Sequence, residues 1–321
     1  MNLPFIPIRT ALYTPAELLE GFEPTIPASL EATKDFTIYR LFAQEAFGTQ
    51  QSPFTSMMES LHDHFINQAV IDFLSLKNLT IGIMGGHDIP RDSPVYGQVA
   101  EFGRLLAKNN ALVVTGGGPG AMEAAHLGAA LVHGSESDLG EAVRRLGLQP
   151  KLPSGLRKVL SSTGQLDSAL RDRYHAWWCP AVELYRSWGS NVGMSLALPT
   201  WYYGHETFTP FATHIGKYFQ NSLREDGLVS FCTGGVVYTP GGAGTLQEVF
   251  QDAAKNYYRS VDDRFSPMIF LGSQYWSSTF NVVPLLKQLF AEADFSSAVL
   301  VTDSIEEATN FLLRKAASAG A

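Results

Sequence analysis

The sequence has little cysteine, no excess of basic charge and no long apolar run. Cys179 and Cys232 lie far apart and outside any Cys-x-x-Cys motif, so neither a disulfide framework nor a thiolate metal site is predicted. Lys and Arg number 23 against 31 Asp and Glu, a formal net charge of −8, which argues against nucleic-acid and membrane partners. No segment approaches the roughly 18 apolar residues of a membrane-spanning helix.

The N-terminal residues 1–9 are interrupted by prolines and lack the basic and apolar regions of a signal peptide. A cytoplasmic location is therefore expected. The chain has 321 residues, of which 45% are hydrophobic. It is long enough for a large core, either as one α/β domain or as one domain with an appendage.

Short apolar segments alternate with helical patterns from residue 79 onward. After the first of them, the apolar spacing of Val95, Val99, Phe102 and Leu106 predicts an amphipathic helix. The alternation predicts an α/β fold of the Rossmann-like, doubly wound type with a mostly parallel sheet. Strands are expected at 79–84, 111–115, 192–198, 236–238, 267–272 and 298–302, with an extra one at 228–232, and later helices at 210–225 and 283–293.

Two regions fall outside this alternation. Residues 1–76 are predicted to form an N-terminal, mostly helical appendage to a nucleotide-binding catalytic domain at 77–321. Residues 133–190 show no strand pattern and are predicted to be a helical insertion. Its aromatic residues would suit a lid or a subunit contact, although core packing is their more frequent use; they are Tyr174, Trp177, Trp178, Tyr185 and Trp188.

The appendage contains the sequence His62-Asp63-His64 within a predicted helix at 56–76. Two histidines that are two residues apart on a helix face different directions, so they do not form a metal site together. We expect this segment to be a solvated helix face and predict no metal.

A glycine turn follows the predicted strand at 236–238, where the sequence continues Thr-Pro-Gly-Gly-Ala-Gly-Thr-Leu-Gln-Glu to residue 248. Glycines let a ligand approach the backbone, and the first N–H groups of the following helix are unpaired and favour an anion. The turn therefore predicts a phosphate site. Thr245 and Glu248 also have capping-box spacing, as do Ser304 and Glu307 near the C-terminus, so a purely structural role stays open.

A second glycine turn, Gly-Gly-Gly-Pro-Gly-Ala-Met at 116–122, follows the predicted strand at 111–115. The carboxyl ends of parallel strands share one edge of the sheet, so both turns are expected at one crevice. The phosphate-binding residues predicted there are Gly117, Gly118, Gly120, Ala121, Met122, Gly241, Gly242, Ala243, Gly244 and Thr245.

Two other phosphate-binding motifs fit this sequence less well. The spacing Gly116-x-Gly118-x-x-Ala121 matches the dinucleotide fingerprint. That fingerprint, however, normally follows the first strand and needs an acidic residue ending the next one, whereas Glu136 and Asp138 lie in a Ser-rich segment. A dehydrogenase is therefore disfavoured. Neither turn contains Gly-Lys-Ser/Thr, which excludes a Walker A loop.

The two turns together, in this order, resemble the LOG (Lonely Guy) phosphoribohydrolase family of cytokinin-activating enzymes and nucleotide 5′-monophosphate nucleosidases, formerly labelled lysine decarboxylases. The resemblance covers residues 78–305. It implies hydrolysis of the N-glycosidic bond of a nucleoside 5′-monophosphate to the free base and ribose 5-phosphate, without a cofactor, in a homo-oligomer that is a dimer or larger. Lysine decarboxylation would need a pyridoxal phosphate-binding lysine in a suitable context, and none is evident.

The resemblance also implies the catalytic residues. The family's glutamate maps onto Glu248, and its arginine, on the helix before the Pro-Gly-Gly strand, maps onto Arg224. Lys217 or His214 could hold the corresponding place, because this chain has extra residues before that strand. Glu206 stands where relatives have a Gly-Glu pair near the base.

The residue types suit this chemistry. A carboxylate near the ribose can stabilise an oxocarbenium-like transition state and activate water. The same turns would also serve a non-catalytic nucleotide or phosphorylated-cofactor carrier, which is the alternative function.

Overall fold

The computed structural model describes residues 3–45, 50–161, 165–202, 208–258 and 265–319. The strands in these residues form one sheet in the order β4-β3-β2-β1-β5-β6-β7, and each neighbouring pair is parallel. The predicted Rossmann-like α/β fold is confirmed. The strands are β1 (Thr80–Met84), β2 (Leu112–Thr115), β3 (Ser195–Ala197), β4 (His214–Ile215), β5 (Val236–Tyr238), β6 (Met268–Leu271) and β7 (Val299–Thr302).

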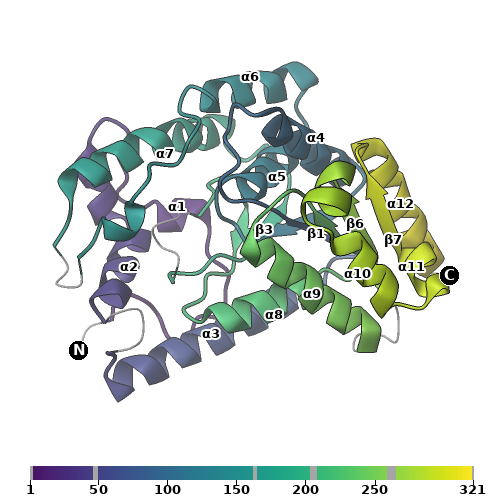
Figure 1. Ribbon diagram of the computed structural model, residues 1–321. Helices are drawn as coiled ribbons and strands as arrows, with labels where there is room; N and C mark the ends of the chain where they lie inside the picture. The colour runs from purple at the N-terminus through teal and green to yellow at the C-terminus, as the bar shows by residue number, and fades with distance from the viewer. Residues whose placement is uncertain (1–2, 46–49, 162–164, 203–207, 259–264, 320–321) are drawn as a thin grey trace.

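Helices cover both faces of the sheet (Figure 1). On one face α4 (Pro94–Lys108) packs against α5 (Ala121–Ala130), and α12 (Ile305–Ala319) packs against α4. On the other face α8 (Asn221–Phe231) packs against α9 (Ala243–Tyr258). This double cover explains why β1, β2, β5 and β6 are buried throughout and read as continuous apolar runs.

The direction in which the chain winds reverses at β1. The chain proceeds from β1 through β2 and β3 to β4 at one edge, then returns to β5 on the other side of β1 and continues to β7. The helices η4 (Tyr275–Thr279), α10 (Val282–Leu289) and α11 (Glu292–Ala298) connect β6 to β7. A ligand in such a sheet binds at the switch point, here the carboxyl ends of β1 and β5.

The N-terminal region lies beside the β4 edge of the sheet, in purple in Figure 1. It contains α1 (Pro15–Leu18), η1 (Pro27–Ala32), α2 (Lys34–Gln44) and α3 (Pro53–Leu74). Tyr13 exchanges two backbone hydrogen bonds, of 2.8 and 2.9 Å, with Ile215 of β4. This antiparallel bridge covers the sheet edge, which would otherwise present unpaired backbone groups.

The expectation of a solvated helix face at His62 and Asp63 is wrong. Both side chains are fully buried. His62 Nε2 pairs with the Tyr13 hydroxyl at 2.9 Å, and Asp63 accepts the N–H groups of Phe219 and Gln220 just before α8. The polar residues of α3 are buried because they satisfy groups of two other segments, which a one-helix pattern does not reveal.

The segment at 133–190 is helical, with α6 (Glu136–Leu146), η3 (Leu156–Lys158) and α7 (Ser168–Trp188). α7 packs on η1 of the N-terminal region and on α6. Tyr174, Trp177 and Trp178 are buried in the core. In the described chain these aromatic residues therefore pack internally, the more frequent of the two expected uses.

Two expected elements around residue 220 are wrong. The helix predicted at 210–225 is instead the edge strand β4 followed by α8, which begins at Asn221. Gly216 follows β4 directly and packs closely on α3, because a Cβ at this position would lie 2.9 Å from Val70 Cγ2. The extra strand predicted at 228–232 is the end of α8, where Leu228 and Val229 are buried.

Over the described ranges, no helix combines the length and apolar character needed to cross a bilayer.

Candidate functional site

A cavity of about 330 Å³ opens at the switch point of the sheet. Its lining includes Gly116, Gly118 and Met122 after β2 and Gly242, Ala243, Gly244 and Thr245 after β5. The two predicted glycine turns therefore meet at one site. They are not on neighbouring strands, because β1 lies between β2 and β5 and adds a third turn, Gly85-Gly86-His87, to the lining. This third turn was not predicted as part of the site, although two glycines directly after an apolar strand are its signal in the sequence.

The middle turn joins the other two. The N–H of Gly86 donates to the Pro240 carbonyl at 3.0 Å, and the Gly86 carbonyl accepts the N–H of Ala121 at 3.1 Å. Gly120 has a φ of +69°, and a Cβ there would lie 2.3 Å from the Gly86 oxygen. Glycine at 120 is thus required both by its backbone conformation and by the close approach of the two turns.

The turn after β2 is also fixed by hydrogen bonds that involve buried side chains. The N–H of Gly117 donates to Thr115 Oγ1 at 2.8 Å, and this hydroxyl pairs with His126 Nε2 at 2.9 Å. His126 Nδ1 pairs in turn with Ser195 Oγ on β3. Burial lowers the pKa of His126 to about 3, so its ring is neutral at physiological pH.

The predicted phosphate-binding residues divide into two groups. Those that line the cavity are Gly118, Met122, Gly242, Ala243, Gly244 and Thr245. The residues that do not line it are Gly117, Gly120, Ala121 and Gly241. The amides of Gly117 and Ala121 donate to protein acceptors. A Cβ at Gly242 or Gly244 would meet nothing within 4 Å, so the backbone there faces open space.

The first turn of α9 faces this cavity. The helix begins at Ala243, and its first intrahelical bond runs from the N–H of Leu246 to the Gly242 carbonyl at 3.1 Å. The expected capping box of Thr245 and Glu248 is wrong, because Thr245 is already inside the helix. The amides of residues 243–245 precede that first bond and have no intrahelical acceptor, an arrangement that favours an anionic ligand.

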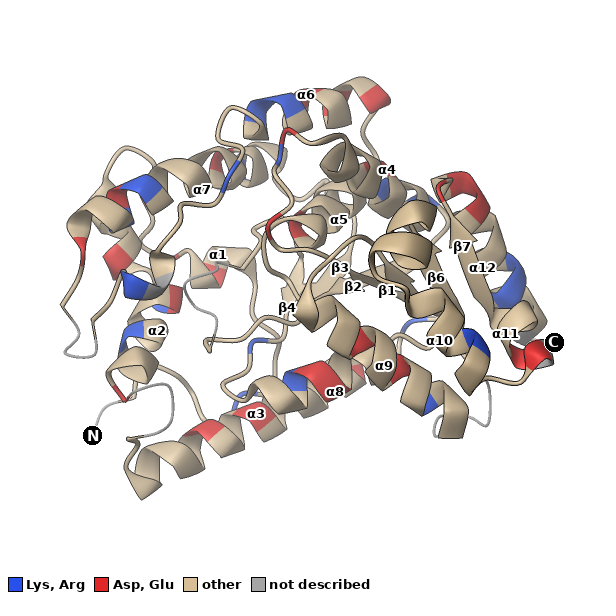
Figure 2. Cartoon of the chain, viewed as in Figure 1, with Lys and Arg blue, Asp and Glu red and all other residues tan. Residues whose placement is uncertain are grey.

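Glu248 and Arg224 meet beside these amides. Arg224 lies on α8, the helix before β5, and its Nη1 is 3.8 Å from Oε1 of Glu248 on α9. The two side chains are 12% and 14% exposed, so both are mostly withdrawn from water but open to the cavity. Figure 2 shows the basic and acidic segments of α8 next to the acidic ones of α9.

The Arg224 guanidinium has N–H donors that its contacts within the described chain do not use. Its Nη2 donates to Asn221 Oδ1 at 2.6 Å, and its Nη1 lies 3.4 Å from the position a Cβ would take at Gly116. Within the part of the chain that the structure describes, the buried Nε has no hydrogen-bond partner. The cation thus lies over the second glycine turn with donors available to an anionic ligand.

Burial raises the pKa of Glu248 to about 7, although the nearby Arg224 lowers it and the neighbouring carboxylate of Glu225 raises it. Glu225 also lines the cavity and accepts hydrogen bonds from Asn221 at 2.7 Å and Gln247 at 2.6 Å. A carboxyl group with this pKa exchanges protons near neutral pH, as a general acid or base requires.

The other candidate residues lie elsewhere. Lys217 is buried and donates to Asp35 Oδ1 at 2.5 Å, and burial lowers the pKa of its ammonium group. His214, on β4, has its ring centroid 4.3 Å from that of Phe73, and burial lowers its pKa. Neither lines the cavity, and Glu206 lies outside the described residues. In the residues with described positions, no three His, Cys, Asp or Glu side chains gather as metal ligands.

Residues 78–136 match the model of the SLOG cluster4 family, LDcluster4. The match runs from just before β1 to the first residue of α6, so it includes the turns after β1 and β2 but neither Arg224 nor Glu248. The SLOG superfamily includes LOG-like proteins, and the match indicates a nucleotide-related function. No curated protein matches the sequence.

Proposed function

We propose that the protein hydrolyses the N-glycosidic bond of nucleoside 5′-monophosphates, releasing the free base and ribose 5-phosphate. The observation that carries this proposal is the position of the Glu248 carboxyl, with its pKa near 7, beside Arg224 at the edge of an anion site. The SLOG match supports a nucleotide as the ligand.

The 5′-phosphate would bind at the start of α9. The unpaired amides of residues 243–245 and the positive end of the helix dipole favour a dianion there. Gly242 and Gly244 leave its approach open, since no Cβ blocks it. The phosphate takes no part in bond breaking, so its binding energy holds the ribose in position for reaction.

Glu248 lies one helical turn beyond these amides, which suits a group that acts on the ribose. In the reaction the C1′–N bond breaks, its electron pair leaves with the base, and a water oxygen bonds to C1′. Ionised Glu248 would stabilise the positive charge that develops on the ribose and accept a proton from the water. The base takes up a proton as it leaves, so one water is consumed for each bond broken.

Arg224 would have an electrostatic role. Its guanidinium lies between Glu248 and the second glycine turn, so it can hold an anionic or hydroxyl group of the substrate. Its charge also lowers the pKa of Glu248 and so favours the ionised carboxylate. Replacing it with lysine keeps the charge but loses the fork of donors, and we expect that variant to remain impaired.

The test is incubation with a panel of nucleoside 5′-monophosphates, followed by chromatography for the free base and an assay for ribose 5-phosphate. Glu248→Gln should lower turnover roughly 10²–10⁴-fold, the range typical of a lost acid or base. Asp226→Asn is the matched control, because Asp226 is an exposed carboxylate on α8 that does not line the cavity. Nucleotide that binds but stays intact after long incubation would support the carrier function instead.

A further inference from the structure

The backbone carbonyls of the turn after β5 are held by the turns on either side of it. On the β1 side, the Pro240 carbonyl accepts the N–H of Gly86 at 3.0 Å. On the β6 side, the Gly241 carbonyl accepts the hydroxyl of Tyr275, the first residue of η4, at 2.5 Å. Tyr275 is not among the residues that line the candidate cavity, so its link with the site is this backbone oxygen.

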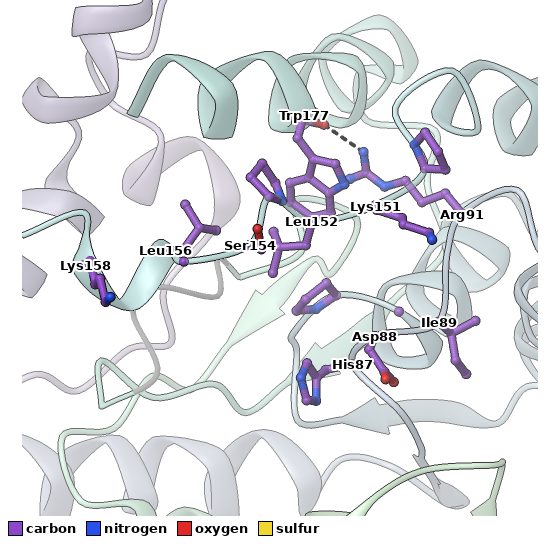
Figure 3. Close-up of a pocket in the computed structure, with 15 residues that line it drawn as sticks. His87, Asp88, Ile89, Arg91, Lys151, Leu152, Ser154, Leu156, Lys158 and Trp177 are labelled. Atoms are coloured by element: carbon purple, nitrogen blue, oxygen red, sulfur yellow. Dashed lines mark hydrogen bonds between the residues drawn. The ribbon is translucent and has the colours of Figure 1, made fainter. Parts of the chain in front are cut away.

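The segment after β1 is a fixed support for this turn. Arg91, further along that segment, is 1% exposed and donates through Nε and Nη2 to both carboxylate oxygens of Glu123 on α5, at 2.8 and 2.6 Å. Its Nη1 donates to the Trp177 carbonyl of α7 at 2.7 Å, the dashed line in Figure 3. A buried guanidinium that is bonded through each of its nitrogens keeps the segment in place. The position of Pro240 is therefore set from this side.

The segment after β6 is fixed in a similar way. Trp276 is fully buried, and its Nε1 lies 3.1 Å from the carbonyl oxygens of both Tyr238, the last residue of β5, and Leu271. Gly272 has a φ of +101°, and a Cβ there would lie 3.3 Å from Pro240 Cγ. The residue before Trp276, whose hydroxyl reaches the turn, is therefore held between two anchored positions.

The hydrogen bond from Tyr275 affects how α9 begins. A regular α-helix would extend back with a bond from the N–H of Thr245 to the carbonyl four residues earlier, that of Gly241. In the described chain this bond is absent, and the first one runs from Leu246 to Gly242. The Gly241 oxygen accepts from Tyr275 instead, so the N–H of Thr245, a residue of the cavity lining, stays available for a ligand.

We infer that Tyr275 is a positioning residue for the 5′-phosphate. By holding the Gly241 carbonyl, its hydroxyl keeps α9 from extending back and reserves the Thr245 N–H for a phosphate oxygen. The N–H of Gly242 belongs to the same trans peptide as that carbonyl, so the same bond sets its direction. Tyr275 thus acts on phosphate binding through the backbone and takes no part in bond breaking. This inference rests on the proposed nucleotide site at the glycine turns.

The test is Tyr275→Phe, which removes the hydroxyl alone. Glu248→Gln serves as the background protein so that AMP is not hydrolysed. Calorimetry gives the dissociation constant of AMP, and inorganic phosphate is measured as its competitor. Tyr275→Phe should weaken the binding of both ligands by the same factor, roughly 3–10-fold, the net effect of one hydrogen bond. An equal loss assigns the effect to the phosphate site, because inorganic phosphate has neither ribose nor base.

Two control variants separate this role from general damage. Tyr257→Phe removes the hydroxyl of an exposed tyrosine on α9. Ser273→Ala removes a hydrogen bond that the turn after β6 makes to Asp303, away from the Pro-Gly-Gly turn. Each control should change both affinities less than about twofold.

Several results would overturn the inference: unchanged affinities in Tyr275→Phe, a loss confined to AMP, an equal loss in Ser273→Ala, or a background protein that binds neither ligand. The proposed hydrolysis is judged separately. If the wild-type chain binds AMP and phosphate with this dependence on Tyr275 but leaves AMP intact, only the hydrolysis fails.

Discussion

The Asp63 carboxylate on α3 accepts a 2.8 Å hydrogen bond from the backbone N–H of Gln220, the N-cap residue of α8. It also accepts the N–H of Phe219 at 2.9 Å. Arg224 lies one turn further along, and its N–H bonds back to the Gln220 carbonyl. The N-terminal region thus fixes the start of the helix that carries the candidate catalytic cation, and connects residues below 76 to the site.

Asp63→Ala should therefore destabilise the fold and misplace Arg224. The buried N–H of Phe219 would lose its acceptor, at about 1–3 kcal/mol, and the part-buried N–H of Gln220 would lose its own at a lower cost. Asp63→Asn keeps one acceptor oxygen and should cost less. Urea unfolding measures the stability, and kcat should fall in variants that remain folded.

Two results separate this positioning role from general damage. The affinity for inorganic phosphate, which the α9 amides would bind, should change less than about twofold. Asp72→Ala, an exposed change on the same helix, should leave both stability and kcat unaltered. A fully active Asp63→Ala protein would show that Arg224 does not depend on this cap.

The pH dependence of catalysis should follow Glu248. If its ionised form is the base, kcat/KM should rise with pH and level off above a pKa near 7. Glu225→Gln removes a carboxylate that raises this pKa, so the rise should move to lower pH. Asp226→Asn should leave the profile in place. A profile that is flat between pH 5 and 9 in all three proteins would exclude Glu248 as the titrating base.

The free energy of unfolding should also depend on pH through Glu248. It should fall as the pH rises, whereas kcat/KM should increase. The folded state raises the pKa of Glu248 from 4.5 to about 7, so ionisation costs more in the folded than in the unfolded protein. The cost is absent below pH 4.5, grows as the pH rises towards 7 and is constant above it. Glu248→Gln should therefore stabilise the fold at pH 8, by up to about 3 kcal/mol at 1.36 kcal/mol per pKa unit, and have little effect at pH 4.5. Equal effects at both pH values would contradict the raised pKa.

The sheet was largely predictable from local patterns, because most of its strands are short apolar runs, and β1, β2, β5 and β6 are closely followed by glycine. The edge strand β4 was not, since its two residues are held by partners distant in sequence, β3 and Tyr13. The polar residues His62 and Asp63 were misjudged for the same reason. Their burial depends on Tyr13 and on the start of α8, which a helical pattern within residues 56–76 cannot show.

The site was predictable in its residue types more than in its arrangement. Glycine turns and a nearby glutamate indicate an anion site with a carboxylate, and the structure brings Glu248 to Arg224. Its third turn, at Gly85 and Gly86, depends on β1 lying between β2 and β5, which is a property of strand order. The choice among Arg224, Lys217 and His214 also needed the fold, because only the first of them lines the cavity.

The glycines of the site should separate into structural and ligand-facing positions. Gly120→Ala places a Cβ 2.3 Å from the Gly86 oxygen at a φ of +69°. It should destabilise the protein by more than about 1 kcal/mol, since the conformation is incompatible with alanine. Gly242→Ala meets no atom within 4 Å, so its unfolding free energy should stay within about 0.5 kcal/mol of wild type.

For substrate binding, Gly242→Ala should have a marked effect although its effect on stability is small. A phosphate held closely by the amides after Gly242 would meet the new methyl group, so Gly242→Ala should raise KM for the nucleotide although the fold is intact. Thermal unfolding with and without phosphate measures both properties in one experiment: the ligand should raise the Tm of wild type more than that of Gly242→Ala. An equal increase in Tm for the two proteins would place the phosphate away from the start of α9.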